Sequence, residues 1–197
     1  MAEVKSNKLQ RALRWLRRFR HRRGYGIHSP FAFGFVTGVV YEKGEYYHYN
    51  HIRSYYKAMR ARPACLRLKD CKLLFRLANF QHPARCLITA FGSAESAEYV
   101  MYNLREACAS ACYTAEAGES ADMIVCGTEW PARVDQLAES LREGGMMIVT
   151  HVGGRNRGAW LRLLQHPKAQ VTFDLYDFGI VCYRLELQRQ HYVINYF

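Results

Sequence analysis

Small and polar residues stand just after three short apolar segments, where they could meet a ligand. Thr89, Gly92 and Ser93 close the first segment, Glu116 closes the second, and Gly127 closes the third. A glycine turn lets the backbone approach a ligand closely. A carboxylate about two dozen residues further on can accept both hydroxyl protons of a ribose. This spacing is typical of a site for a nucleotide-type cofactor.

A fourth apolar segment ends in Thr150 and His151. An imidazole titrates near neutral pH, so His151 is a weak candidate for a general base. His28, His48 and His51 have no acidic or thiol partner at the spacing of metal ligands, and the seven cysteines include no CxxC pair. We therefore expect no metal site. We also expect reduced, buried cysteines and a cytoplasmic protein.

Short apolar strands that alternate with helices must position these residues. The alternation predicts an α/β fold with a mainly parallel sheet that is covered on both faces. In such sheets, ligands bind past the carboxyl ends of the strands. A hairpin-like group around Asp177–Gly179 predicts an antiparallel edge. The expected strands cover 85–91, 111–118, 121–127, 146–152, 169–185 and 190–197, and the expected helices cover 69–82, 93–110, 131–145 and 158–168.

Local signals mark several ends of these helices. Ser29 is a plausible N-cap, because Pro30 follows at the first helical position. Pro83 predicts the end of the helix before the first strand. Gly144 and Gly145 predict the end of the helix before the fourth strand.

The positive charge is concentrated at the start of the chain. Residues 1–23 carry nine Lys and Arg against Glu3, a net charge of 9 − 1 = +8 out of +11. Apolar residues recur every three or four positions here, which predicts a basic amphipathic helix over 8–23. It could dock on the domain with its arginines in solvent, bind RNA, DNA or anionic lipid, or be a cleavable or disordered arm. We expect one domain over 24–197, and no apolar run is long enough for a transmembrane helix.

The motifs "YGIHSPFAF", "LLFRLANF", "CYTAEAGE", "ADMIVCG" and "LREGGMMIVT" recur in one known group of proteins, as do the closing segments "HPKAQVTFDLYDFGIVCYR" and "QHYVINYF". Nearly all of the chain after residue 24 resembles the class I S-adenosylmethionine-dependent methyltransferases. More narrowly, it resembles a bacterial family of small O-methyltransferase-like proteins. The resemblance implies a Rossmann-like methyltransferase sandwich, S-adenosylmethionine as a possible cofactor and a small-molecule acceptor.

Several functional positions of that family are altered in this chain. The acid that ends the first strand falls at Thr89, and the two turn glycines fall at Phe91 and Glu95. Gly92 could stand in for one of them. Side chains at the glycine positions would occupy the space of the cofactor. Glu116, in contrast, matches the family's ribose-binding acid.

The acids that bind a metal or orient the acceptor in related enzymes are also replaced. The Asp after the third strand falls at Gly127, and the paired aspartates fall at Thr150 and His151. If the cofactor binds, the resemblance assigns it to Thr89, Gly92, Ser93, Glu116 and Gly127. We expect a degenerate cofactor site with weak or no activity. The alternative is a non-catalytic protein that binds an anionic partner through residues 8–23.

The chain also lacks a unit that the family has. Between Glu119 and Ala121 the family places a helix, a strand and another helix, and this chain has a direct connection. The deletion should remove the edge strand. It could expose a new sheet edge, which must be paired, covered or blunted. A homodimer through that edge is one expected solution.

Overall fold

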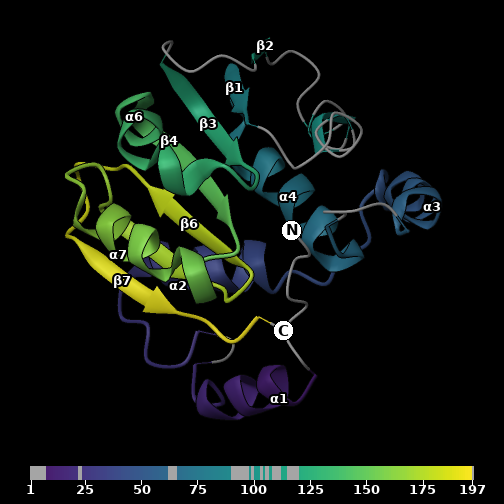
Figure 1. Cartoon of the computed structure of the whole chain (residues 1–197), viewed down its shortest axis with the longest axis horizontal. Coiled ribbons are helices and arrows are strands. Elements are labelled where there is room, and N and C mark those ends of the chain that lie inside the picture. The colour runs from purple at the N-terminus through teal and green to yellow at the C-terminus, as the bar shows by residue number, and fades with distance from the viewer. Residues whose placement is uncertain are drawn as a thin grey trace.

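The computed structural model describes residues 8–21, 24–61, 66–89 and 120–196, and between the last two ranges residues 98, 100–102, 104, 107 and 112–114. In this part of the chain, seven strands form one sheet with helices on both faces (Figure 1). The main elements are α1 Lys8–Arg17, α2 Pro30–Phe35, the π-helical η1 Val36–Val40, α3 Tyr49–Met59, α4 Leu68–Gln81, β1 Arg85–Ile88, β2 Cys112–Thr114, β3 Ala121–Cys126, η2 Trp130–Ala132, α6 Val134–Glu139, β4 Leu141–Thr150, η3 Gly154–Asn156, α7 Arg157–Gln165, β5 Val171–Asp174, β6 Phe178–Cys182 and β7 Gln190–Val193.

The sheet has the strand order β2-β1-β3-β4-β6-β5-β7. Parallel pairing joins β2, β1, β3 and β4, and also joins β5 to β7. Only β6 runs antiparallel to its neighbours, β4 and β5. The expected mainly parallel sheet with antiparallel pairing toward one side is therefore confirmed. Because β6 opposes both neighbours, β4 and β5 run in the same direction and end at the same edge of the sheet.

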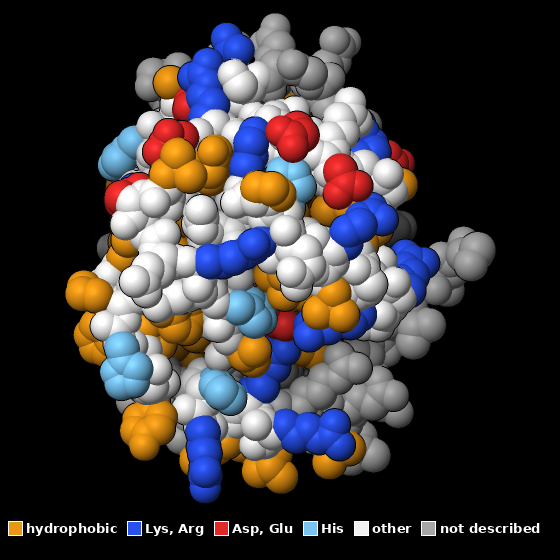
Figure 2. Space-filling model, turned by 90° about the vertical axis from the view of Figure 1, so that its left-hand side faces the viewer, with side chains coloured by type: hydrophobic (Ala, Val, Ile, Leu, Met, Phe, Trp, Pro, Cys, Tyr) orange, Lys and Arg blue, Asp and Glu red, His pale blue; other side chains and the backbone are white. Residues whose placement is uncertain are grey.

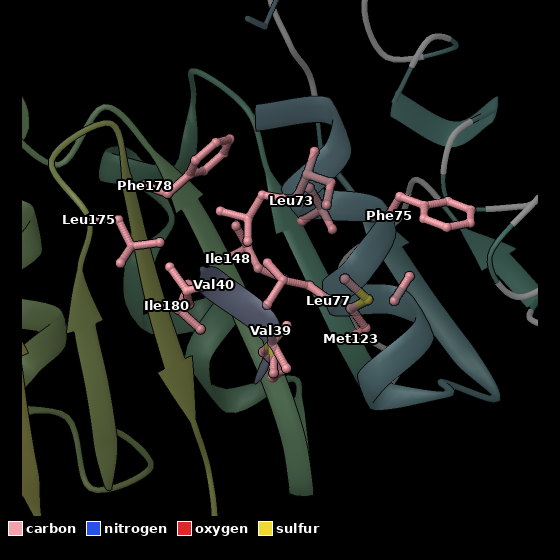
Figure 3. Close-up of a cluster of buried hydrophobic side chains, with 14 of the residues drawn as sticks. Val39, Val40, Leu73, Phe75, Leu77, Met123, Ile148, Leu175, Phe178 and Ile180 are labelled. Carbon is pink, nitrogen blue, oxygen red and sulfur yellow. The ribbon is translucent and has the colours of Figure 1, made fainter. Parts of the chain in front are cut away.

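Alternating side chains of the strands fill two hydrophobic cores. In β4, Met146 and Ile148 face the core beneath α2, α3 and α4, whereas Met147 and Val149 face the core beneath α6 and α7. This alternation follows from the two-residue period of a strand, and it requires helices on both faces. Figure 3 shows Leu77 of α4 lying among strand side chains of the first core.

The predicted ends of two helices are confirmed. The Ser29 hydroxyl accepts a hydrogen bond from the Ala32 N–H at 3.3 Å, and Pro30 is the first residue of α2. Helix α4 ends at Gln81, just before Pro83. Both ends could be predicted because capping depends on residues a few positions apart.

The predicted role of the glycine pair at 144–145 is wrong. Helix α6 already ends at Glu139, and the glycines lie inside β4. Gly144 has a φ of 76°, and a Cβ on Gly145 would lie 2.7 Å from the carbonyl oxygen of Arg142. The pairing of β3 with β4 shifts register at this place. The glycines therefore permit a bulge that lets Leu141 join the sheet early.

The sheet is shortened as expected. Strand β2 ends at Thr114 and β3 begins at Ala121, and the six residues 115–120 between them are too few for a helix, a strand and a second helix. Strand β2 is consequently an edge strand of the described sheet. The homodimer through this edge remains a prediction. None of the helices in the described ranges is long and apolar enough to cross a bilayer.

Candidate functional site

The residues after β1 and β3 and the last residue of β4 are connected by side-chain hydrogen bonds. The Thr89 hydroxyl accepts from the Gly127 N–H at 3.1 Å. The Thr150 hydroxyl donates to the Gly127 carbonyl at 2.6 Å, and the Trp130 indole donates to the Thr150 carbonyl at 2.7 Å. All four residues are buried. The structure thus brings together two of the predicted cofactor-binding positions, Thr89 and Gly127.

These contacts show what the threonines do in place of acids. Buried backbone groups must be hydrogen-bonded, and the two hydroxyls satisfy both polar groups of the Gly127 backbone. A hydroxyl is neutral, so it makes weaker hydrogen bonds to a ligand than a carboxylate does. Burial also raises the pKa of the neighbouring Cys126 thiol, which therefore stays uncharged at neutral pH. Thr89, Gly127 and Thr150 thus supply polar groups that carry no negative charge.

Gly92, Ser93 and Glu116 lie outside the described residues, as do Phe91 and Glu95. Among the residues that are described, no group of three or more His, Cys, Asp or Glu is arranged to hold a metal ion.

His151, the candidate base, begins the loop that follows β4. Its side chain is exposed, and its backbone has a φ of 55° in the left-handed region. The His151 N–H donates to the Asp177 carbonyl at 2.7 Å, which fixes the loop against the β5–β6 turn. Histidine tolerates this conformation better than most residues. The imidazole therefore stands at the strand-end edge, beside the residues that line a cavity.

That cavity has a volume of about 360 Å³ and lies between α1 and the carboxyl ends of β4 and β5. Its walls combine three arginines with one acid. Tyr176 lines it from the β5–β6 turn with a φ of 78°, a rare conformation for a bulky residue. Such backbone strain persists only where surrounding contacts enforce it. The lining residues are Arg17, Arg18, Arg157, Asp174, Tyr176 and the segment 152–154.

Asp174 organises this cavity. It is the last residue of β5, and only 1% of it is exposed. One carboxylate oxygen accepts from Arg18 at 2.9 Å and from the Tyr176 N–H at 3.0 Å. The other oxygen accepts from Arg157 at 3.0 Å. A buried carboxylate is stable only when it is paired in this way. Asp174 therefore joins α1, α7 and the β5–β6 turn.

Sequence analysis missed this cluster. Asp174 is separated from Arg18 by 156 positions, so no local spacing indicates the pair. Within the segment "VTFD", the acid ends a strand whose four residues are all buried. An acid at a strand end, at the edge where ligands bind, is the one signal that could have drawn attention to it.

Helix α1 is attached to the domain by polar contacts. Besides the Arg18–Asp174 pair, the Asn195 side chain donates to the Trp15 carbonyl at 3.2 Å and the Asn195 N–H donates to the His21 carbonyl at 2.8 Å. The large apolar side chains of α1 and of the turn after it remain partly exposed. Their exposed fractions range from 38% to 64%, for Leu13, Trp15, Leu16 and Phe19.

This arrangement differs from the simplest expectation for the segment. A helix docked on a domain normally buries its apolar stripe and leaves its charges in water. Here Arg18 is directed into the body, where its side chain is only 18% exposed, and the apolar stripe remains partly exposed. The segment is docked on the domain, but Arg18 is an exception to the expectation that its arginines are solvated. Arg17 and Arg20 do remain exposed.

Comparison with known proteins finds a match in structure alone. No family model matches the chain, and no curated relative matches it. Among solved structures, the SAH-bound methyltransferase PaMTH1 from Podospora anserina is similar, with a TM-score of 0.51 at 10% identity over 80% of this chain and 97% of that chain. The O-methyltransferase TomG from Streptomyces achromogenes has a TM-score of 0.46 at 13% identity, with 75% and 96% of the two chains covered. An O-methyltransferase from Bacillus cereus has a TM-score of 0.45 at 13% identity, with 75% and 95% covered.

The likeness to PaMTH1 shows that the chain shares the Rossmann-like fold of that methyltransferase. At this level of identity the likeness concerns the fold, and function has to be argued from the site.

Proposed function

We propose that this chain is a methyltransferase-like protein whose cofactor site is degenerate and whose activity is weak or absent. The observation that carries the proposal is the hydrogen-bonded link between Thr89, Gly127 and Thr150. The resemblance calls for acids at these three strand-end positions. The side chains that are present instead stabilise the backbone of the fold.

The described residues do not fit a methyl donor of the nucleoside type well. A donor with a ribose and a charged amino group is held best by carboxylates, because charge-assisted hydrogen bonds are the strong ones. Thr89 offers only a hydroxyl that is already engaged with Gly127. We derive no reaction step through a bound donor for this reason.

Any residual transfer would depend on His151 as a general base toward a small acceptor. The imidazole is exposed at the same edge of the sheet as the cavity, and Val152 and Gly153, which follow it in the chain, line that cavity. A base within hydrogen-bond reach of an acceptor hydroxyl is the geometry such a step needs. The buried, free cysteines of the described ranges support a cytoplasmic setting, which is also part of this proposal.

Donor binding can be tested by thermal unfolding in the presence of S-adenosylmethionine or S-adenosylhomocysteine. A ligand at about 100 times its Kd adds roughly 2.7 kcal/mol of stability, which shifts the Tm of a domain of this size by several degrees. We expect a shift below about 1 °C at millimolar ligand. A larger shift that disappears in Glu116→Ala would show a functional ribose contact and contradict the degenerate site.

We propose, as a second function, that the chain binds an anionic partner through residues 8–23. The division into this basic segment and a domain over 24–197 belongs to the same proposal. The supporting observations are the net charge of +8 in residues 1–23 and the exposure of Arg17 and Arg20. Binding through neutralised charges weakens as salt rises.

Retention on immobilised heparin, a generic polyanion, tests this second function. The Arg17→Glu/Arg20→Glu variant should elute at a clearly lower salt concentration than the unmodified protein, because each reversal replaces an attractive charge by a repulsive one. Lys57→Glu/Arg60→Glu is the matched control, since both side chains are exposed at the end of α3. Equal elution of the two double variants would contradict a binding role for α1.

A further inference from the structure

Among the described residues, α1 and the turn after it carry an apolar stripe, made of Leu13, Trp15, Leu16 and Phe19, that remains partly exposed. Leu13, Trp15, Leu16 and Phe19 belong to neither hydrophobic core. They account for four of the ten exposed large hydrophobic residues, although α1 and its following turn are short. The Trp15 and Phe19 rings contact each other edge to face, with centroids 5.3 Å apart.

The helix is held in a fixed orientation with this stripe partly exposed. Arg18 donates to the carboxylate and to the backbone carbonyl of Asp174, and Asn195 contacts the backbone at both ends of the segment 15–21. The largest exposed apolar patch of a monomer is often functional. The hydrogen bonds of Arg18 and Asn195 hold the segment against the domain while its apolar stripe stays partly exposed.

Positive charge surrounds the stripe. Arg17 and Arg20 are exposed beside it, and the wall of the adjacent cavity adds Arg18 and Arg157 against the single acid Asp174. Figure 2 shows one face of the molecule, and at its lower end orange hydrophobic side chains lie between blue Lys and Arg side chains. Helix α1 lies at the lower end of the molecule in Figure 1. Basic residues on the polar face and Leu, Trp and Phe on the other face are the composition of a helix that lies in a membrane interface.

Other occupants fit these observations less well. A nucleic acid would use the arginines and could stack on the aromatic rings, but it gains nothing from the aliphatic side chains of Leu13 and Leu16. A second copy of α1 would bring two strongly positive segments together. If a large apolar side chain has a surface of about 200 Å², the exposed parts of the four stripe residues add up to roughly 400 Å². This area is well below the ~800 Å² that each partner buries in a stable protein interface.

We propose that α1 docks the protein on an anionic lipid bilayer, with the stripe of Leu13, Trp15, Leu16 and Phe19 inserted among the lipids and the exposed arginines against the headgroups. This inference rests on the second proposed function and names its partner. A short helix with few inserted side chains gives reversible, peripheral attachment. It would hold the domain at a membrane surface without spanning it.

Binding of the full chain to lipid vesicles tests the proposal. The vesicles are phosphatidylcholine alone, or phosphatidylcholine with about one-third phosphatidylglycerol. Trp130 and Trp160 are fully buried, whereas Trp15 is 38% exposed, so a blue shift of the fluorescence reports insertion of Trp15. We expect co-sedimentation and a blue shift with anionic vesicles only, and the shift should be lost in Trp15→Phe.

Matched variants separate insertion from nonspecific adhesion. Leu13→Ser/Leu16→Ser should weaken binding to anionic vesicles at least tenfold, because the inserted surface is lost. Leu161→Ser/Leu185→Ser is the control, since these leucines are similarly exposed elsewhere on the protein, at 47% and 55%. Equal weakening in both variants, or no weakening in either, would overturn the proposal.

The remaining outcomes distinguish the membrane proposal from the second proposed function, binding of an anionic partner, on which it rests. Retention on heparin without vesicle binding would overturn the membrane inference and leave an anionic partner in place. Tighter binding to single-stranded RNA, unaffected by Leu13→Ser/Leu16→Ser, would assign the helix to nucleic acid. A blue shift that grows with protein concentration in the absence of vesicles would assign the stripe to a second copy. Failure of both heparin and vesicle binding would remove both proposals.

Discussion

Replacement of Asp174 by Ala should lower the free energy of unfolding by about 3 kcal/mol, and the Tm should fall by several degrees. The carboxylate is 1% exposed and accepts hydrogen bonds from Arg18, Arg157 and the Tyr176 N–H. Its removal leaves the Tyr176 N–H buried without this acceptor and leaves Arg18 facing the domain without its counter-ion. Urea unfolding monitored by circular dichroism measures the change.

The same substitution should also loosen α1. Arg18 is the side chain through which the helix contacts β5, so trypsin should cleave within residues 8–21 faster in Asp174→Ala. The matched control is Asp135→Ala, because Asp135 is 66% exposed and lies 3.5 Å from Arg162. A solvent-exposed ion pair of this kind contributes at most about 1 kcal/mol. Equal stability of the two variants would show that Asp174 does not organise the site.

The Gly179→Ala substitution should lower the free energy of unfolding by about 3 kcal/mol, because the added methyl group overpacks the core. A Cβ at position 179 would lie 2.6 Å from Cη2 of the Trp160 ring, closer still to Cζ3, and 2.7 Å from a methyl group of Val152. Trp160 is fully buried in the core beneath α6 and α7, so it cannot move aside cheaply. The glycine lets β6 pass directly beneath this ring. Chemical unfolding measures the loss.

Two further variants isolate the cause. Gly158→Ala is the control, because no atom lies within 4 Å of the added Cβ and the residue is in α7; this change should be neutral or stabilising by up to about 1 kcal/mol. In a Trp160→Phe background, Gly179→Ala should lower the free energy of unfolding by clearly less, because the smaller ring leaves room for the added methyl group. An equal cost in both backgrounds would contradict overpacking against Trp160.

The fold could be predicted largely from local patterns. Apolar strands separated by periodic helices indicate a parallel α/β sheet, and Ser29 with Pro30 marks a helix start within a few residues. The glycines at 144–145 show where this reasoning fails. They resemble a helix end, but Leu141 pairs with Ala121 across the sheet, and a pairing partner twenty positions away leaves no local signal.

The candidate site was less predictable for the same physical reason. Periodicity predicts that the segment 8–23 has an apolar face and a basic face, but only the buried Asp174 decides that Arg18 contacts the domain. The resemblance assigns Thr89 and Gly127 to cofactor binding, and the structure shows a hydrogen bond from the Gly127 N–H to the Thr89 hydroxyl. Hydrogen bonds between strand ends depend on strand order, which residue spacing alone leaves open.

The central claim is that the methyl-donor site has lost its function while the fold has been retained. Titration calorimetry of the full chain with S-adenosylhomocysteine tests it most directly, because the ligand is the demethylated product and binding needs no acceptor. The account predicts no saturable heat up to about 1 mM ligand, equivalent to a binding free energy weaker than about −4 kcal/mol. Stoichiometric binding with a Kd in the range of about 1 μM, near −8 kcal/mol, would contradict it.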